Sequence, residues 1–205
     1  TLPPQAEGTE GFLFLASEGG MVKRIALEDL PGLTAKPFQV MGLNGDALGW
    51  AAWTTGSDEV ILVRAEGYAI RFKEEEVRPT GLPAGGVKGV KLGGRADRVV
   101  GMMVVRPRAD LWIVTADGSA KCTPVDEYPT QGRYGQGVIA MRLGKGEQLT
   151  AAALGTGAVA GAPGRARPVR PAPGGHVRRP PGASLRDRPG TRAAGRATNE
   201  AQERR

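Results

Sequence analysis

Residues 60-VILVRAEGYAIRFKEEEVRP-79 contain an apolar run, an acid followed by glycine, and a second run in which apolar and polar residues alternate. Two such runs on either side of a glycine turn are typical of a β-hairpin. The same arrangement occurs twice more, in 12-FLFLASEGGMVKRIALEDLP-31 and 111-LWIVTADGSAKCTPVDEYPT-130. Each copy ends in an acidic cluster followed by a proline. The chain therefore repeats one hairpin three times, which predicts a repeated β architecture.

The turn of each hairpin is predicted at a glycine, because tight hairpin turns need a positive backbone φ that glycine adopts without strain. The predicted turn residues are Gly19, Gly67 and Gly118, which are 48 and 51 residues apart. This near-constant spacing indicates that the whole unit, and not only the hairpin, is repeated.

A second feature follows each hairpin: an apolar stretch, then a glycine turn with an acid, then a further apolar strand. It occurs in 40-VMGLNGDAL-48, 87-VKGVKLGGRADRVV-100 and 138-VIAMRLGKGEQL-149. A period of about fifty residues with about four strands per unit is typical of one blade in a propeller-like array. We therefore predict an all-β, β-pinwheel or propeller-like fold with about three blades. Their predicted boundaries lie near residues 12–58, 59–109 and 110–154.

The two ends of the chain differ from these repeats. Residues 1–10 read as a linker, and Gly, Ala, Pro and Arg make up 37 of the 51 residues in 155–205. That segment cannot bury enough apolar surface to offset its chain entropy, so we expect it to be disordered. Three interpretations stay open for it: an arginine-rich nucleic-acid arm, a solvated low-complexity tail, or the out-of-frame product of a GC-rich gene.

The formal net charge of +7 comes entirely from this last segment. Residues 1–154 hold 17 Lys and Arg against 18 Asp and Glu, a net charge of −1. Residues 155–205 hold 11 Arg against 3 acids, a net charge of +8. The basic composition of the whole chain therefore says nothing about what the repeats bind.

Several classes of function are excluded by composition. The single Cys122 rules out an internal disulfide, and the single His176 lies outside the repeats, so no Cys/His zinc site or Ser-His-Asp triad can form in 1–154. We expect no catalytic residue, no metal site and no cofactor in this chain. No apolar run is long enough to span a membrane and no signal peptide is present, so we expect no membrane contact. The chain does not begin with Met and opens on the linker-like TLPPQAEGTEG, so we expect a fragment of a longer cytoplasmic protein.

Three phrases carry a family resemblance: 20-GMVKRIALEDLP-31, 77-VRPTGLPAGGVKGVKL-92 and 127-EYPTQGRYGQGVIAMRL-143. Over residues 11–154 the chain resembles the C-terminal domain of the DNA gyrase A protein and of its topoisomerase IV relative. The resemblance implies a six-bladed β-pinwheel whose neighbouring blades exchange strands, of which about three blades are present here.

The resemblance also implies a function, which is to wrap double-stranded DNA and so support ATP-dependent negative supercoiling by the whole enzyme. The implied partners are the remainder of gyrase A, together with gyrase B, in the bacterial cytoplasm at the nucleoid. The nucleophilic tyrosine of the breakage-reunion domain and the ATP site have no counterpart in this chain.

One departure from the family pattern concerns the gyrase box, Gln-basic-Arg-Gly-Gly-basic-Gly, which is absent here. The nearest stretch, 131-QGRYGQG-137, agrees only at Gln131, Arg133, Gly135 and Gly137. We interpret it as a degenerate blade version in which Tyr134 occupies a turn. Topoisomerase IV therefore stays open as an alternative to gyrase, as does a propeller-like protein scaffold that does not bind DNA.

DNA wrapping requires cations along a curved face, where they neutralise phosphates without reading the sequence. The candidate DNA-binding residues are Lys23, Arg24, Arg71, Lys73, Arg78, Lys88, Lys91, Arg95, Arg98, Lys121, Arg133, Arg142 and Lys145. The three tryptophans, Trp50, Trp53 and Trp112, lie in apolar strands and are predicted to be core residues.

Overall fold

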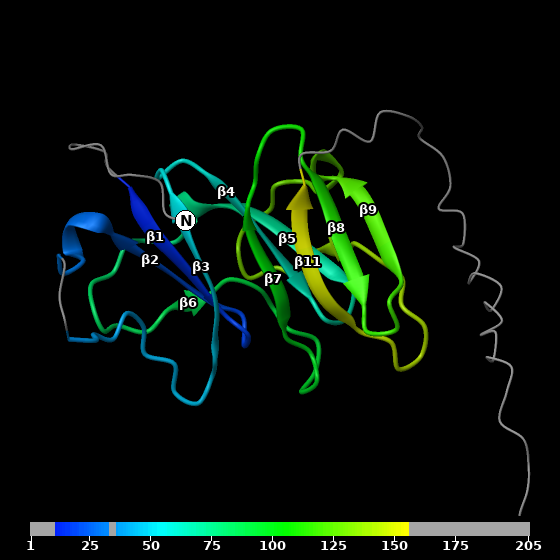
Figure 1. Ribbon diagram of the computed structural model, residues 1–205, viewed down its shortest axis with the longest axis horizontal. Helices are drawn as coiled ribbons and strands as arrows, with labels where there is room; N and C mark the ends of the chain where they lie inside the picture. Colours follow the sequence, from blue (N-terminus) through cyan, green and yellow to red (C-terminus); the bar gives the residue numbers. More distant parts are fainter. Residues whose placement is uncertain (1–10, 33–35, 156–205) are drawn as a thin grey trace, which may run out of the picture. The chain divides into compact units, whose positions relative to one another are not determined.

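The structure, a computed structural model, describes residues 11–32 and 36–155. This part of the chain contains eleven β-strands and three one-turn 3-10 helices, without an α-helix (Figure 1). It also contains no helix long and apolar enough to cross a membrane. The prediction of an all-β repeat fold is confirmed. The predicted linker 1–10 and the predicted tail beyond Gly155 lie outside the described residues.

The described strands form three antiparallel sheets, one around each predicted hairpin, which we call blades 1, 2 and 3. Blade 1 contains, in spatial order, β3 (Leu48–Thr54), β1 (Phe12–Ser17), β2 (Met21–Ala26) and β6 (Val87–Lys88). Blade 2 contains β10 (Val138–Ile139), β5 (Tyr68–Lys73), β4 (Glu59–Arg64) and β7 (Val99–Val104). Blade 3 contains β11 (Leu149–Gly155), β8 (Asp110–Thr115) and β9 (Ala120–Pro124). The 3-10 helices Leu27–Asp29, Glu74–Glu76 and Val125–Glu127 follow the hairpins at their acidic clusters.

Each hairpin turns at a glycine with positive φ, namely Gly20 at 81°, Gly67 at 87° and Gly118 at 88°. The prediction is confirmed for Gly67 and Gly118 and wrong for Gly19. In blade 1 the Gly20 amide donates to the Ser17 carbonyl, just as the Gly67 amide donates to Arg64. The sequence offers two adjacent glycines there, and the hydrogen-bond register of the turn selects the second.

Neighbouring blades are joined by exchanged strands. β6 follows β5 along the chain but pairs with β2 of blade 1, with Val22 opposite Val87. β10 likewise follows β9 but pairs with β5 of blade 2, with Ala69 opposite Val138. Backbone hydrogen bonds from Gly89 to Gly20 and from Ala140 to Gly67 extend each pairing by one residue. Blades 1 and 2 are thus each completed by a two-residue strand from the following repeat.

The core lies between the blades, which explains why β4 is apolar on both faces. Val60 and Leu62 pack with Phe14 of blade 1. The alternate residues Ile61 and Val63 pack in the cluster shared with blade 3. Because side chains alternate across a strand, a strand covered on both faces reads as a continuous apolar run. The VILV sequence of β4 therefore follows from the position of blade 2 between two neighbours.

The tryptophan predictions are corrected by the structure. Trp112 on β8 is 40% exposed, so its prediction as a core residue is wrong. Trp50 and Trp53 are half-buried, and Trp50 packs against the core between blades 1 and 2. The physical reason for the exposure of Trp112 is that no described strand covers that face of blade 3.

The glycine turns provide a test of the strand exchange. A Cβ added at Gly67 would overlap the Met141 carbonyl oxygen just after β10, whereas one added at Gly118 would meet nothing within 4 Å. Both glycines have nearly the same positive φ, so Gly118→Ala measures the backbone cost alone, about 1–2 kcal/mol. We expect Gly67→Ala to lower the free energy of unfolding by clearly more, as measured by urea denaturation of the two variants. Equal losses would contradict a close approach of β10 to the blade 2 turn.

Candidate nucleic-acid interface

The thirteen predicted DNA-binding cations fall into three groups by exposure. Lys23 and Arg24 are buried, and Arg71 and Arg133 are half-buried. The other nine are exposed: Lys73, Arg78, Lys88, Lys91, Arg95, Arg98, Lys121, Arg142 and Lys145. The structure therefore separates cations that stabilise the blades from cations that are available to an anionic partner.

Lys23 belongs to the first group. Its side chain is 1% exposed, and its Nζ donates to the carbonyls of Val40, Gly81 and Ala84 at 2.8, 2.9 and 2.8 Å. Burial lowers the pKa of the Lys23 ammonium from its ordinary value. Three donors satisfied by backbone carbonyls leave none for a phosphate, so the geometry gives Lys23 a structural role.

Arg24 and Arg71 occupy equivalent positions on β2 and β5, and both interact with groups of the protein. Arg24 lies 3.6 Å from the Glu74 carboxylate and stacks over the Phe12 ring at 4.4 Å. Arg71 donates from Nε to Glu59 at 2.9 Å and from a terminal nitrogen to the Val125 carbonyl at 3.2 Å. Each arginine thus joins its hairpin to a neighbouring segment.

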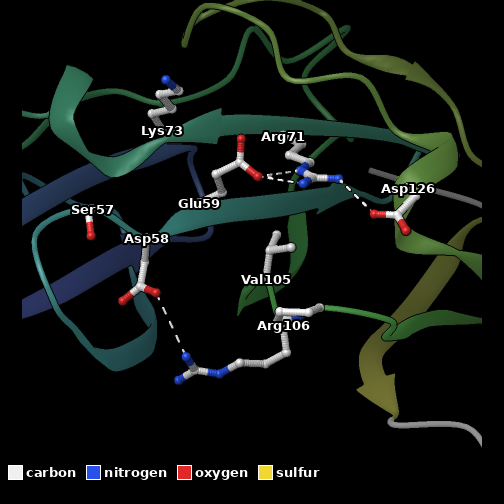
Figure 2. A pocket seen from close by; sticks show the side chains of 9 residues that line it. Ser57, Asp58, Glu59, Arg71, Lys73, Val105, Arg106 and Asp126 are labelled. Carbon is white, nitrogen blue, oxygen red and sulfur yellow. Dashed lines mark hydrogen bonds and ion pairs between the residues drawn. The ribbon is translucent and has the colours of Figure 1, made fainter.

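Figure 2 shows the open pocket around Arg71, which has a volume of about 470 Å³. Its carboxylates and cations are paired: Asp126 lies 3.8 Å from Arg71, and Arg106 lies 3.7 Å from Asp58. Burial alone would raise the pKa of Glu59, but hydrogen bonds from Thr130 and Arg71 outweigh it and lower that pKa. The predicted candidate Lys73 also lines this pocket, among charges that largely compensate one another.

Two equivalent chain segments carry most of the exposed cations. Each begins with an exchanged strand and leads to the outer strand of its own blade. Segment 87–98 carries Lys88, Lys91, Arg95 and Arg98, and segment 138–148 carries Arg142 and Lys145. The equivalent segment of the first repeat, 38–47, carries no cation. Six of the nine exposed candidates therefore lie on two repeats of one structural feature.

The acids in these segments are engaged with the protein. Asp97 is buried and accepts from Arg64 Nε at 2.8 Å and from the Gly93 amide at 2.9 Å. Glu147 accepts from the Gly144 amide at 2.6 Å. Both carboxylates are used to close their own loops, so the cations supply most of the exposed charge there.

A basic and aromatic cluster forms where the loop 131–137 lies beside β6. The Tyr134 amide donates to the Gly89 carbonyl at 2.7 Å, and the Lys91 amide donates to the Gly135 carbonyl at 2.9 Å. Lys88 Nζ lies 5.0 Å from the centre of the Tyr134 ring, and Arg133 donates to the Lys88 carbonyl at 3.0 Å. We call Lys88, Lys91, Arg133 and Tyr134 the Tyr134 cluster.

Tyr134 was not predicted to take part in the interface. It lies in the predicted turn, where its φ is 66°, and its side chain is 44% exposed. An exposed aromatic ring held beside the Lys88 ammonium can stack on a sugar or a base, as aromatic side chains do in nucleic-acid sites. The signal in the sequence was a tyrosine inside a glycine-rich loop next to basic strands, but only the fold brings Lys88 to it.

The described residues form no site suited to a metal ion. Among residues 11–32 and 36–155, no group of three or more His, Cys, Asp or Glu side chains is placed to hold a metal ion. The site consists of exposed cations, one exposed aromatic ring and glycine-rich backbone, which together suit an extended polyanion.

Blades completed by strands from the following repeat, with a basic edge on the exchanged segments, define the class of protein as a β-pinwheel or propeller-like domain. Residues 11–47, 58–106 and 110–154 match the family model described as the DNA gyrase C-terminal domain, beta-propeller. The chain belongs to this DNA gyrase C-terminal domain family.

Individual relatives agree with this assignment. The chain is 41% identical to the DNA gyrase A protein of Salmonella typhimurium over 68% of its own length and 16% of that protein. It is 37% identical to the DNA gyrase A protein of Escherichia coli over 74% of its length and 17% of that protein. Its fold is similar to the crystal structure of the C-terminal domain of DNA topoisomerase IV, with a TM-score of 0.69 and 26% identity, over 75% of this chain and 49% of that one. The chain thus spans a small part of the length of the gyrase A proteins it resembles.

The buried ammonium of Lys23 yields a prediction with a matched control. Lys121 occupies the equivalent position on β9 and donates to the Ala140 carbonyl at 2.6 Å, but its side chain is exposed. We expect Lys23→Met to lower the free energy of unfolding by about 1–3 kcal/mol, because three backbone carbonyls lose the buried ammonium that donates to them. Lys121→Met should change it by no more than about 0.5 kcal/mol, as surface substitutions usually do. Thermal and urea unfolding of the two variants measure the difference, and similar effects would argue against a structural role for Lys23.

Proposed function

We propose that this chain binds duplex DNA without strong sequence preference and wraps it, as the C-terminal part of the DNA gyrase A protein. The observation that supports this best is the gathering of six exposed cations on segments 87–98 and 138–148 of a member of the gyrase C-terminal domain family. The same position in successive blades would place a cation at regular intervals along a bound duplex.

The proposed contact is electrostatic. Lysine and arginine side chains replace the counterions of the phosphates, and the released ions make binding strongly dependent on salt. The Tyr134 cluster adds an aromatic ring at the junction of blades 1 and 2, where β6 meets the loop that leads to β10. Because the buried acids Asp97 and Glu74 bind groups of the protein, the near-neutral repeats can still present a basic surface to DNA. Contacts of this kind need no metal and no cofactor in this chain.

The remaining parts of the proposal concern the whole enzyme. The partners would be double-stranded DNA, the remainder of gyrase A, and gyrase B, in the bacterial cytoplasm at the nucleoid. ATP-dependent negative supercoiling would belong to that assembly, since this chain spans only 16% and 17% of the length of the two gyrase A relatives.

A second candidate is the C-terminal domain of the topoisomerase IV protein that corresponds to gyrase A. It is favoured by the structural similarity to the topoisomerase IV domain and by the absence of the full gyrase box in residues 131–137. The relatives from Salmonella typhimurium and Escherichia coli are gyrase A proteins, and for this reason gyrase is the first proposal. A protein scaffold without DNA binding is the third possibility, and it differs from both in whether it binds DNA at all.

The first experiment measures duplex DNA affinity against salt concentration for the full chain. A variant with glutamine at Lys88, Lys91, Arg95, Arg98, Arg142 and Lys145 should lose several units of the log–log slope, at about 0.9 per phosphate contact. The matched control changes six arginines of 155–205 to glutamine, namely Arg178, Arg179, Arg186, Arg188, Arg192 and Arg196, so both variants lose six charges. If only the variant with six changed arginines in 155–205 loses slope, the C-terminal segment binds DNA and the blades do not.

The second experiment asks whether bound DNA is wrapped. Nicked plasmid is closed by ligase in the presence of the full chain, and the linking number is read on a gel after the protein is removed. Wrapping should shift the topoisomer distribution in proportion to the amount of protein bound, because the path of the DNA is fixed when the nick closes. The six-glutamine blade variant should give a much smaller shift. Binding without any shift would contradict wrapping and leave a simple DNA-binding module.

A further inference from the structure

One face of blade 3 is apolar and exposed in the described structure. Residues opposite each other across β8, β9 and β11 share a face, because directly paired residues point to the same side of a sheet. The face built around Trp112, which we call the open face, contains Trp112, Val114, Ala120, Cys122, Ala151 and Ala153. Five of these six residues are exposed, and Val114 is half-buried.

The equivalent faces of the other two blades are covered. Phe14 and Ala16 in blade 1, and Ile61 and Val63 in blade 2, occupy the positions of Trp112 and Val114 and are all 0% exposed. In both blades the covering surface is the following blade. The open face therefore has the composition of an interior surface and the exposure of an outer one.

The edge of blade 3 is open in the same way. β2 is paired by β6, and β5 is paired by β10, but β9 is the edge strand of its sheet among the described residues (Figure 1). An unpaired edge of this kind is a template for another strand. In blade 1 the exchanged strand lies opposite Val22 and Met21, and in blade 2 it lies opposite Ala69 and Tyr68. The equivalent residues of β9 are Ala120 and Ser119, so a strand added to blade 3 in the same way would lie opposite these two.

A segment of matching type occurs in the first repeat. Lys23 and Lys121 occupy equivalent positions, and they donate to the carbonyls of Val40 and Ala140. The exchanged strand β10 is the pair of residues directly before Ala140. Residues 38–39, directly before Val40, are therefore its equivalent in the first repeat. Phe38 and Gln39 lie in no described sheet, and Phe38 is 44% exposed. Within residues 11–32 and 36–155, blade 1 thus has a donor segment that pairs with no strand, and blade 3 has an acceptor edge that no strand pairs with.

We propose that a second copy of this chain covers the open face. Phe38 and Gln39 of one copy pair with β9 of the other, opposite Ala120 and Ser119, and blade 1 packs against Trp112. The donor and the acceptor are different surfaces, so the contact is head-to-tail and either closes a ring or continues as a chain of molecules. Burial of an exposed tryptophan and a run of small apolar residues is the driving force.

The segment 156–205 is a poorer occupant on grounds of composition. It contains four large aliphatic residues, Val159, Val169, Val177 and Leu185, and no aromatic residue. The hairpin strands that cover a blade face in this protein each supply two large apolar side chains, Val60 and Leu62 from β4 and Leu111 and Ile113 from β8. A second copy has such a strand set in blade 1.

The test is the mass of the full chain in solution, by size-exclusion chromatography with light scattering, over a wide range of protein concentration. DNA is absent, so the result is independent of the proposed DNA binding, and a thiol reductant prevents crosslinking through Cys122. We expect the mass to rise from 21.4 kDa to at least twice that value with concentration. Trp112→Asp and Phe38→Pro should each remain at 21.4 kDa, since a buried aspartate is unfavourable and proline cannot donate to a strand ladder.

Two controls make the result specific. Ile139→Asp changes an apolar side chain that is 50% exposed on β10, outside the open face, and should associate as the parent does. An equimolar mixture of Trp112→Asp and Phe38→Pro should form a one-to-one complex, because each variant keeps the surface that the other lacks. If the parent associates but this mixture does not, the contact is not head-to-tail and the proposal fails.

Alkylation of Cys122 distinguishes a second copy from the chain's own C-terminal segment. Cys122 lies on the open face, so its reaction with a bulky maleimide should slow as the protein concentration rises. Protection of Cys122 at every concentration in a chain that remains at 21.4 kDa would mean that residues of the same molecule cover the face. That result, or full reactivity at every concentration, would overturn the proposal.

Discussion

The exchange of a two-residue strand between successive repeats is the interaction on which the rest of this structure depends. β6 completes blade 1 and β10 completes blade 2, and each pairing is extended by one backbone hydrogen bond to the glycine of the turn. The exchange fixes the path of the segments that follow, 87–98 and 138–148. It therefore positions both the interblade core and the exposed cations with the same few residues.

The cations of the repeats divide between structure and surface according to where they stand in the blade. Lys23 and Arg71, which follow the hairpin turns of blades 1 and 2, lie near carbonyls and carboxylates of neighbouring segments. Those on the exchanged segments, such as Lys91 and Arg142, are exposed. A charge on a strand must find partners where other segments bury it, whereas a charge in a connecting segment that nothing covers remains in water. This division narrows the candidate interface to one repeated feature.

In blade 3, positions that are buried in blades 1 and 2 are exposed, because none of the described residues covers them. Cys122 stands where Arg24 and Arg71 stand in the other blades, and Trp112 stands where Phe14 and Ile61 are buried. The same strand type is thus interior in one blade and exposed in another. Exposure here is decided by the neighbouring blade and not by the strand itself.

By itself, the sequence determined the repeated hairpin, the all-β fold, the turns at Gly67 and Gly118 and the family resemblance. These depend on alternation and glycine chemistry, which are local properties. Only the tertiary structure decided that Gly20 forms the first turn, that Trp112 is exposed, that Lys23 is buried, and that Lys88 meets Tyr134. Each of these depends on a contact between residues far apart in the chain, and a strand pattern reads the same whether or not another blade lies against it.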